Sequence, residues 1–264
     1  LGAVSSIGAL MEGIQPERYM QPIETIAVVG AGNMGSGIAQ KSAQEQFEVQ
    51  MADREQQWVD KGQQTIANFL SEAIERRIFS PEQVEGIKNR ITGVVGVDNI
   101  ASNTDLVIEA VFEDPAVKAE MTQKVEAIIP EDCIFASNTS TLPITDLAKA
   151  SARPANFIGI HFFSPVEKMN LVEIIMGGET GDYALSRAID FVTKIKKTPI
   201  VVSDTRGFYA NRCVMRFVGE GLKMLSEGVK PALIENAAKM AGMPVGPLSL
   251  QDEVALDLGV KLIK

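Results

Sequence analysis

Residues 23–53 read IETIAVVGAGNMGSGIAQKSAQEQFEVQMAD. The run Ile26–Val29 is short, apolar and rich in β-branched residues, which is typical of a buried strand. After three glycines, apolar residues recur at helical spacing. A second strand-like run then extends from Phe47 to Ala52 and ends at the acidic Asp53. The order of strand, glycine turn, helix, strand and acid predicts a βαβ unit of a parallel sheet.

The glycine turn has the spacing G-x-G-x-x-G. Its first glycine permits a tight turn, its second lets the backbone approach a pyrophosphate, and its third lets the helix pack closely on the strand. The helix N-terminus presents free N–H groups and a partial positive charge to phosphate. A structural glycine turn without a ligand is the alternative. We predict a dinucleotide site formed by Gly30, Gly32, Asn33, Met34 and Gly35.

The acid that ends the second strand indicates which dinucleotide is bound. A carboxylate at Asp53 can accept both ribose hydroxyls of an adenosine, whereas a 2′-phosphate there would meet a like charge. The neighbouring Arg54 leaves NADP as an alternative, because an arginine can serve a 2′-phosphate. We therefore expect the cofactor to be NAD rather than NADP.

Strands and helices alternate through most of the remaining chain. Such alternation is typical of a doubly wound parallel sheet, and the later strands could include antiparallel ones. We expect helices at 58–79, from Ser80-Pro81 to about residue 90, at 114–129 and at 182–196. The further strands expected are 91–95, 106–111, 134–137, 157–162, 171–176 and 200–202.

The pattern changes after Val202, where a polar, turn-like segment follows and no strand pattern continues. Helical patterns cover 208–227 and 231–241, and Gly246-Pro247 opens another. The fold class expected is α/β, a Rossmann-type doubly wound sheet followed by a smaller all-α domain. We place an NAD-binding Rossmann domain at 23–203 and a helical C-terminal domain at 204–264. Residues 1–22 are interpreted as a linker or the tail of a preceding domain.

The composition excludes several classes of protein. The 264 residues suffice for two domains, and 34 acidic against 25 basic residues give a net charge of −9, which argues against nucleic-acid binding. No apolar run approaches the roughly 20 residues that span a bilayer. The cysteines, Cys133 and Cys213, are far apart and lack metal-ligand spacing. We expect reduced thiols in the cytoplasm and propose no metal site.

The single histidine, His161, lies at the C-terminal end of an expected strand, the edge at which ligands bind in open α/β sheets. Histidine is suited to remove a hydroxyl proton near neutral pH while hydride leaves. Glu173 interrupts an apolar run, and burial of a charge needs a partner. It could orient His161 if the two strands pair; otherwise, Glu173 faces water on an edge strand, and His161 bonds only to backbone.

Further polar residues cluster at strand ends. Ser137-Asn138-Thr139-Ser140 follows one strand, and Glu109 and Glu113 flank the end of another. Lys118 begins the following helix on a possible cofactor face, and Asn211 lies near the start of the helical domain. Taken singly, each fits a helix cap or a solvated position better than a functional role.

These motifs occur together, and in this order, in a known family. GAGNMG at 30–35, VIEAV at 107–111, SNTS at 137–140, HFFSP at 161–165, LVEII at 171–175 and GF…NR at 207–212 resemble L-3-hydroxyacyl-CoA dehydrogenases. The resemblance covers residue 23 to the end. It is greatest to the dehydrogenase part of bacterial multifunctional fatty-acid-oxidation proteins, in which a hydratase domain precedes this part through a helical linker.

The resemblance implies NAD-dependent, reversible oxidation of L-3-hydroxyacyl-CoA to 3-ketoacyl-CoA in β-oxidation. It assigns His161 as general base and Glu173 as its orienting partner. Ser140 and Asn211 correspond to the serine and asparagine that contact the substrate and transition state. Glu113, Lys118 and Ser164 correspond to cofactor contacts; some relatives have asparagine in place of Ser164. The serine and lysine that bind CoA do not align clearly, and Arg76 and Arg77 are possible substitutes.

The same resemblance implies an acyl-CoA substrate and a homodimer or a place in a larger β-oxidation complex. In the family the helical domain continues beyond the position of Lys264, so we expect this one to be truncated. Two other functions stay open: a dehydrogenase of another small 3-hydroxy acid, and a non-catalytic dinucleotide-binding relative.

Overall fold

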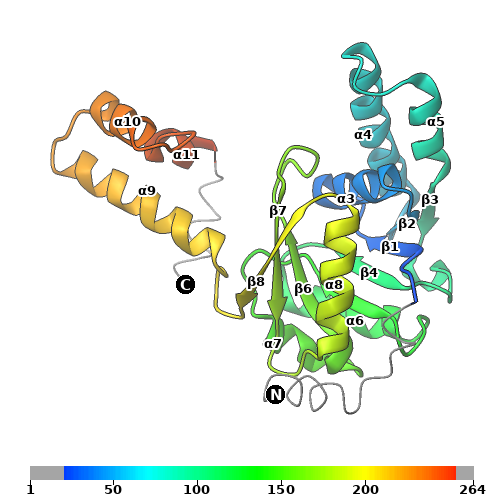
Figure 1. Cartoon of the computed structure of the whole chain (residues 1–264). Helices are drawn as coiled ribbons and strands as arrows, with labels where there is room; N and C mark the ends of the chain where they lie inside the picture. Colours follow the sequence, from blue (N-terminus) through cyan, green and yellow to red (C-terminus); the bar gives the residue numbers. More distant parts are fainter. Residues whose placement is uncertain (1–20, 254–264) are drawn as a thin grey trace, which may run out of the picture.

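The computed structural model describes residues 21–253. One sheet of eight strands forms its centre, in the order β3-β2-β1-β4-β5-β6-β7-β8 (Figure 1). All neighbouring strands are parallel except β6 and β7, which are antiparallel. The strands are β1 (Thr25–Val29), β2 (Glu48–Asp53), β3 (Ile91–Val95), β4 (Leu106–Glu109), β5 (Ile134–Ser137), β6 (Phe157–Phe162), β7 (Leu171–Met176) and β8 (Thr198–Ser203).

Helices cover both faces of this sheet. The helices between the strands are α3 (Asn33–Gln44), α4 (Gln56–Glu75), α5 (Pro81–Asn89), α6 (Pro115–Glu126), α7 (Ile144–Leu147) and α8 (Asp182–Lys194). After β8 the chain continues as α9 (Ala210–Ser226), α10 (Pro231–Met240) and α11 (Pro247–Glu253), which stand apart from the sheet in Figure 1. The predicted fold class, a doubly wound sheet followed by a helical region, is confirmed.

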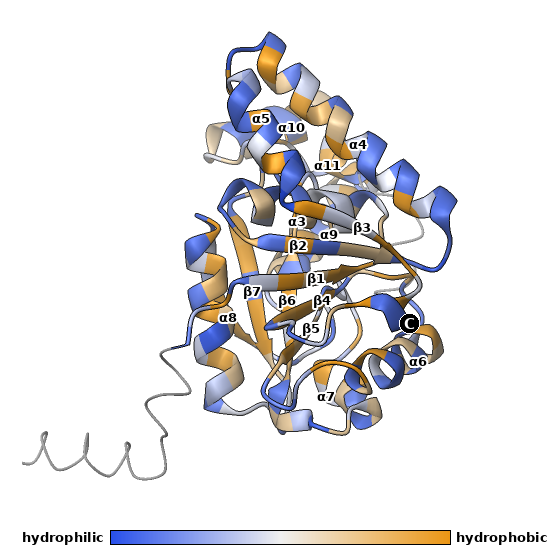
Figure 2. Cartoon of the chain, turned by 90° about the vertical axis from the view of Figure 1, so that its right-hand side faces the viewer, coloured by the Kyte–Doolittle hydropathy of each residue, from blue (hydrophilic) through white to orange (hydrophobic). Residues whose placement is uncertain are grey.

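The alternation of side chains along the strands produces two apolar cores. Ile26 and Val28 of β1 belong to the core under α3, α4, α5 and α8, whereas Ala27 and Val29 belong to the core under α6 and α7. Successive strand residues point to opposite faces, so a strand covered on both sides is apolar throughout. The strands accordingly form the hydrophobic centre in Figure 2, while the helices are hydrophobic on one side only.

Several element ends differ from those expected, for local reasons. The helix expected at 58–79 ends at Glu75, because Arg77 takes a left-handed conformation (φ 58°), and Ser80 then caps α5. The strand expected at 106–111 ends at Glu109, whose side chain accepts a hydrogen bond from the Val111 N–H. The helix expected from 208 starts at Ala210, because Phe208 also has a positive φ. Most of the expected linker at 1–22, and residues 254–264, where we expect the helical domain to be truncated, lie outside the described residues.

Candidate active site

The glycine turn between β1 and α3 has the geometry of a phosphate cradle. Gly30 has φ 103°, and a Cβ on Gly35 would lie 1.7 Å from the Gly30 carbonyl oxygen, so the close approach of helix to strand requires glycine there. A Cβ on Gly32, by contrast, would meet nothing within 4 Å. Gly32 is the N-cap of α3, and no side chain caps this helix. The open space at Gly32 and the uncapped N–H groups fit a bound pyrophosphate.

Asp53 lies beside this turn at the C-terminal end of β2. One of its oxygens accepts a hydrogen bond from the Ala31 N–H at 2.8 Å, and the other from the Arg54 N–H at 2.7 Å. The Arg54 side chain is exposed and pairs with Glu55 at 3.4 Å. The carboxylate of Asp53, rather than the guanidinium of Arg54, is therefore anchored at the turn, as an NAD site requires.

The predicted contact between His161 and Glu173 is present. The two residues lie directly opposite each other on the antiparallel strands β6 and β7, and His161 Nδ1 is 2.8 Å from Glu173 Oε2. β7 lies between β6 and β8, and Glu173 is 0 % exposed, so the alternative of an edge strand with Glu173 in water is wrong. The rings of Phe163 and Phe208 pack beside the imidazole, with centroids 4.5 and 5.8 Å away.

Glu173 also binds the start of α9. Its Oε1 accepts hydrogen bonds from the backbone N–H groups of Tyr209 (3.0 Å) and Ala210 (2.7 Å). Burial by itself would raise the pKa of Glu173, but the hydrogen bonds from His161 and Ala210 outweigh it, so the pKa lies below its ordinary value. The carboxylate is thus held ionised, with its oxygens turned to two different partners.

The segment after β5 joins the site from the neighbouring strand. The Phe162 N–H donates to Asn138 Oδ1 at 2.9 Å, and Asn211 Nδ2 donates to the Ser140 carbonyl oxygen at 3.0 Å. Asp204 fixes the same segment further along, since it accepts from the N–H groups of Ile144 and Thr145. Ser140 and Asn211, which lie 71 residues apart, are therefore brought into contact.

Glu113 and Lys118 lie at the site, and both bind groups of the protein itself. Glu113 accepts from the Thr139 hydroxyl (2.6 Å) and the Ser140 N–H (2.9 Å), and Lys118 Nζ lies 2.7 Å from Glu109 and 3.3 Å from Glu113. Above them lies a pocket of about 200 Å³ that reaches the glycine turn. It is lined by Met34, Ala110, Val111, Glu113, Asn138, Ser140 and Thr141.

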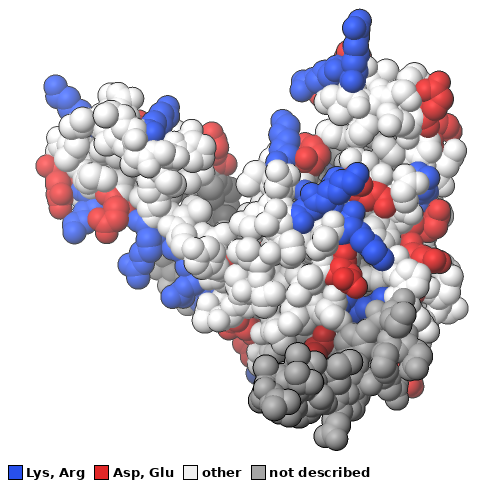
Figure 3. Space-filling model, in the orientation of Figure 1, with Lys and Arg blue, Asp and Glu red and all other residues white. Residues whose placement is uncertain are grey.

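Asn33 and Ser164 are exposed at the surface of the site. Arg76 and Arg77 lie in the turn between α4 and α5, where Arg76 pairs with Glu72 at 3.7 Å. In Figure 3 a broad notch separates the projecting α4–α5 hairpin from the arm that carries α9 and α10. Within the described residues, none of these four hydrogen-bonds or ion-pairs with His161 or Glu173, and their predicted roles stay predictions.

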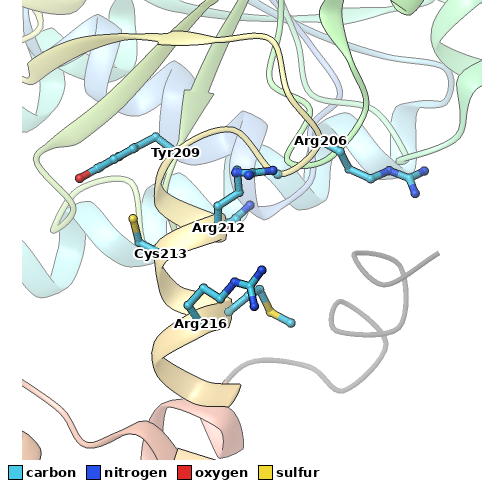
Figure 4. Close-up of a pocket in the computed structure, with 8 residues that line it drawn as sticks. Arg206, Tyr209, Arg212, Cys213 and Arg216 are labelled. Carbon is cyan, nitrogen blue, oxygen red and sulfur yellow. The ribbon is translucent and has the colours of Figure 1, made fainter. Parts of the chain in front are cut away.

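A second, larger pocket of about 800 Å³ lies beside the start of α9. Figure 4 shows Tyr209 and Cys213 to the left of this helix and Arg206 and Arg216 to its right. Within residues 21–253, no ion pair joins Arg206, Arg212 or Arg216 to a carboxylate. On a chain of net charge −9, this surface is locally positive.

The sequence did not predict that Asp204 and Asn138 hold the segment that carries Ser140 in place through hydrogen bonds. The sequence indicates only that Asp204 belongs to a polar boundary, although its carboxylate accepts hydrogen bonds from backbone N–H groups 59 and 60 residues earlier in the chain. An Asp directly after a strand is a frequent capping residue, but nothing in the spacing says which distant helix it caps.

Within residues 21–253, no helix is both long and apolar enough to cross a membrane.

A glycine turn at the end of β1, an acid at the end of β2 and a buried histidine–carboxylate pair at the end of β6 define an NAD-dependent dehydrogenase. Comparison with known families is in agreement. The family model described as "3-hydroxyacyl-CoA dehydrogenase, NAD binding domain" matches residues 25–205. The model described as "3-hydroxyacyl-CoA dehydrogenase, C-terminal domain" matches residues 207–264. The chain belongs to the 3-hydroxyacyl-CoA dehydrogenase family and carries its NAD-binding domain.

Two similar proteins share the name fatty acid oxidation complex subunit alpha. The protein of Psychrobacter cryohalolentis is 38% identical over 246 residues, which are 93% of this chain and 34% of that protein. That of Pseudomonas aeruginosa is 39% identical over 243 residues, 92% of this chain and 34% of that protein. This chain therefore spans about a third of the length of these relatives.

Solved structures show the same fold. The structure of (S)-3-hydroxybutyryl-CoA dehydrogenase from Ralstonia eutropha has a TM-score of 0.88 and 36% identity, and the match covers 91% of this chain and 86% of that one. The 3-hydroxybutyryl-CoA dehydrogenase from Escherichia coli has a TM-score of 0.88 and 30% identity, with 92% and 52% covered. Both the resemblance seen in the motifs and the expected fold are thereby confirmed.

Proposed function

We propose that this chain catalyses the reversible, NAD-dependent oxidation of an L-3-hydroxyacyl-CoA to the 3-ketoacyl-CoA, as a step of fatty-acid β-oxidation. The observation that carries the proposal is the buried His161–Glu173 pair, at the sheet edge that also bears the glycine turn. Alcohol oxidation needs a base beside a dinucleotide, and this arrangement supplies one. The names of the similar proteins support an acyl-CoA substrate.

His161 acts as the base through its Nε2 atom. Glu173 is held ionised and can only accept hydrogen bonds, so the Nδ1 atom that faces it carries the proton of the neutral imidazole. Nε2 then has a free lone pair, which can take the proton of the substrate's 3-hydroxyl. In the reverse direction the same atom returns the proton to the carbonyl oxygen.

Glu173 stabilises the imidazolium that forms. Because the pair is buried, the attraction between the carboxylate and the charged ring is stronger than it would be in water. The N–H groups of Tyr209 and Ala210 fix the other carboxylate oxygen, so Glu173 cannot turn away when the charge on His161 changes.

The residues that would hold NAD are Gly30, Gly32, Asn33, Met34 and Gly35 around the pyrophosphate and Asp53 at the adenosine ribose. NAD bound there would supply the hydride acceptor for the carbon that bears the hydroxyl. We assign Ser164 and Glu113 to the nicotinamide side, and Ser140 and Asn211 to the acyl substrate. The pocket beside Asn211 is positively charged, which favours binding of an anionic thioester such as acyl-CoA. The charges come from Arg206, Arg212 and Arg216.

A comparison of substrates tests this function. The protein should reduce acetoacetyl-CoA with NADH and leave free acetoacetate unchanged, whereas a dehydrogenase of a small free acid would do the reverse. A non-catalytic relative would bind NADH and turn over neither. Loss of thioester turnover in His161→Gln, with NADH binding retained, would assign the measured activity to this site.

We also propose that the chain is the dehydrogenase part of a multifunctional fatty-acid-oxidation protein, with the NAD-binding domain at 23–203 and the helical domain at 204–264. The support is that relatives named fatty acid oxidation complex subunit alpha match it over a third of their length. A homodimer or a larger complex, in the cytoplasm, is the expected setting. Mass photometry and cell fractionation of the protein expressed from its own gene would test both expectations.

A further inference from the structure

A buried lysine lies behind the turn that joins β6 to β7. Lys197 stands between α8 and β8, and only 6 % of this residue is exposed. Burial lowers the pKa of Lys197, and the charge of Lys41 lowers it further. Among residues 21–253, no carboxylate forms an ion pair with Lys197. A buried charge needs strong partners, so the groups that Lys197 binds indicate what it does.

The partners of Lys197 are two backbone carbonyl groups of the turn. Its Nζ atom donates to the Val166 and Met169 carbonyl oxygens, each at 2.6 Å. The hydrogen bonds inside the turn use a different acceptor, because the N–H groups of Lys168 and Met169 both donate to the Pro165 carbonyl oxygen. Hydrogen bonds from a charged donor are stronger than those between neutral groups. The ammonium group therefore ties the turn firmly to the segment that precedes β8.

The turn has one other anchor, on α3. Of the eight residues 163–170, five are exposed and only Val166 is buried. Val166 packs on α3 at Gly37, where a Cβ would lie 3.0 Å from the valine side chain. The turn between β6 and β7 accordingly lies beside α3 (Figure 1). An apolar contact on one side and the ammonium group of Lys197 on the other thus fix its position.

This turn joins the catalytic base to the cofactor side of the site. It begins directly after β6, and the Phe163 ring lies 4.5 Å from the imidazole of His161. Ser164, which we assign to the nicotinamide, comes next. A shift of the turn would move Ser164 relative to bound NAD. It would leave in place Asp53 and the glycine turn, which serve the adenosine ribose and the pyrophosphate.

We infer that Lys197 is a positioning residue, whose ammonium group holds the β6–β7 turn against α3 so that Ser164 faces the nicotinamide. The inference rests on the proposed function for the place of Ser164. Lys197 acts through the turn rather than on a reacting group. Its effect on cofactor binding should therefore be confined to the nicotinamide end.

Two ligands separate this effect from a general loss of structure. ADP-ribose has the adenosine, the pyrophosphate and the second ribose of NADH but lacks the nicotinamide. A loosened NAD-binding domain would bind both ligands less tightly, whereas a displaced β6–β7 turn should weaken NADH alone. The ratio of the two dissociation constants is therefore a measure that a merely structural role of Lys197 would not change.

The principal variant is Lys197→Met, which keeps the length of the side chain but removes its donors. Lys197→Gln, a shorter and uncharged donor, takes its place if Lys197→Met does not fold. The matched control is Lys196→Met. Lys196 precedes Lys197 in the chain and pairs with Glu45 at 2.8 Å, but its side chain is 75 % exposed. Ser164→Ala, alone and combined with Lys197→Met, tests the residue through which the turn acts.

Three quantities are measured on each variant of the 264-residue chain. They are the dissociation constants of NADH and ADP-ribose, hydrogen exchange of the Lys168 and Met169 amides without ligand, and kcat/KM for acetoacetyl-CoA. We expect Lys197→Met to weaken NADH about fivefold or more, to change ADP-ribose less than about twofold, and to lower kcat/KM roughly 30-fold. Exchange of the two amides should become faster. Lys196→Met should match the wild type in all three quantities.

The double variant should bind NADH no more weakly than Lys197→Met alone, because both changes remove the same contact. Equal weakening of NADH and ADP-ribose in Lys197→Met would overturn the inference, and so would unchanged NADH affinity or unchanged amide exchange. If Ser164→Ala weakens NADH and Lys197→Met does not, the inference fails while the role of Ser164 stands. If the wild type does not reduce acetoacetyl-CoA, the proposed function fails, while the ratio of dissociation constants and the amide exchange still decide the inference.

Discussion

At the scale of single residues, Glu173 determines in the proposed mechanism which nitrogen of His161 acts as the base. Its two oxygens have separate tasks: one accepts from the imidazole, and the other accepts from two backbone N–H groups at the start of α9. The carboxylate therefore cannot rotate without losing one set of donors. The tautomer of His161 is thus fixed by the same contacts that join α9 to the sheet.

Glu173→Gln tests this dependence on the tautomer. The glutamine oxygen should face the two N–H donors of α9, which places its NH₂ group against His161 Nδ1. Nδ1 would then accept and Nε2 would carry the proton, so the base would be lost although the histidine remains. We expect kcat to fall by roughly 10²–10⁴ in both Glu173→Gln and His161→Gln, with NADH affinity nearly unchanged. A Glu173→Gln protein of near wild-type rate would contradict this assignment.

At the same scale, the proposed role of Asp53 is to set the choice between NAD and NADP. A carboxylate anchored to the Ala31 N–H should repel a 2′-phosphate, so we expect NADH to bind at least about tenfold more tightly than NADPH, or ~1.4 kcal/mol. Asp53→Ala should narrow this ratio, measured by fluorescence titration with both cofactors. Arg54→Ala is the matched variant, and it should leave the ratio unchanged, because Arg54 pairs with Glu55.

The buried carboxylates also predict how stability depends on pH. Burial opposes ionisation of Glu173 and Glu113, but their partners outweigh it, and the pKa of each lies below the ordinary value of 4.5. A depressed folded-state pKa means stabilisation that is fully present above the ordinary value and lost as pH falls through the folded value. We expect the melting temperature to fall below about pH 4.5, and to fall less steeply in Glu113→Gln. If the melting temperatures of Glu113→Gln and the wild type fell in parallel from about pH 6 to about pH 3, Glu113 would not be the group that causes the loss of stability.

At the scale of elements, much of this protein is predictable from sequence. Each strand of the sheet is a short apolar run bounded by turn residues, so its place in the chain could be predicted. Helix α7, with four residues, is too short to show a period and was missed. The contact between His161 and Glu173 could be inferred because a buried charge needs a partner and the chain has one histidine.

The partners of Lys118 could not be predicted in the same way. Its acceptors come from β4 and the following turn, and Glu113 reaches donors 26 to 28 residues away on another loop. A motif fixes which residue types are near a site but not which way a long side chain points. That direction depends on the packing of β4, β5 and α6 against one another, which the local sequence pattern does not contain.

The glycine turn gives a prediction at the scale of an element, because two of its glycines have opposite surroundings. Gly35→Ala would force a Cβ against the Gly30 carbonyl oxygen, so helix α3 must move away from β1. We expect a clear loss of melting temperature. Gly32→Ala places its Cβ in open space and needs no unusual φ, so stability should be unchanged while NADH binding weakens about tenfold or more. Equal NADH affinity in Gly32→Ala and wild type would exclude a pyrophosphate at this turn.

At the scale of the whole molecule, α9 belongs to two regions at once. Its first residues contact Glu173 and Ser140 of the proposed active site, while the rest packs against α10 and α11, away from the sheet. The segment between β8 and α9 is also held in place, because Asp204 accepts hydrogen bonds from the first N–H groups of α7. The position of the helical region therefore affects the geometry of the reacting groups.

The helical region also exposes apolar surface. Leu233 and Met240 of α10 are 62 % and 89 % exposed, and a hollow of about 280 Å³ that includes Leu233 is lined by apolar residues, most of them from α9 and α10. Contiguous apolar surface of this kind is typical of contacts with other protein surfaces. We expect the 264-residue chain to bind a hydrophobic dye and to self-associate through this face. Leu233→Glu should reduce both effects in fluorescence and light scattering without changing NADH affinity. Lys239→Gln makes the same change of charge on the same helix and should reduce neither; if it does, net charge rather than apolar contact governs the association.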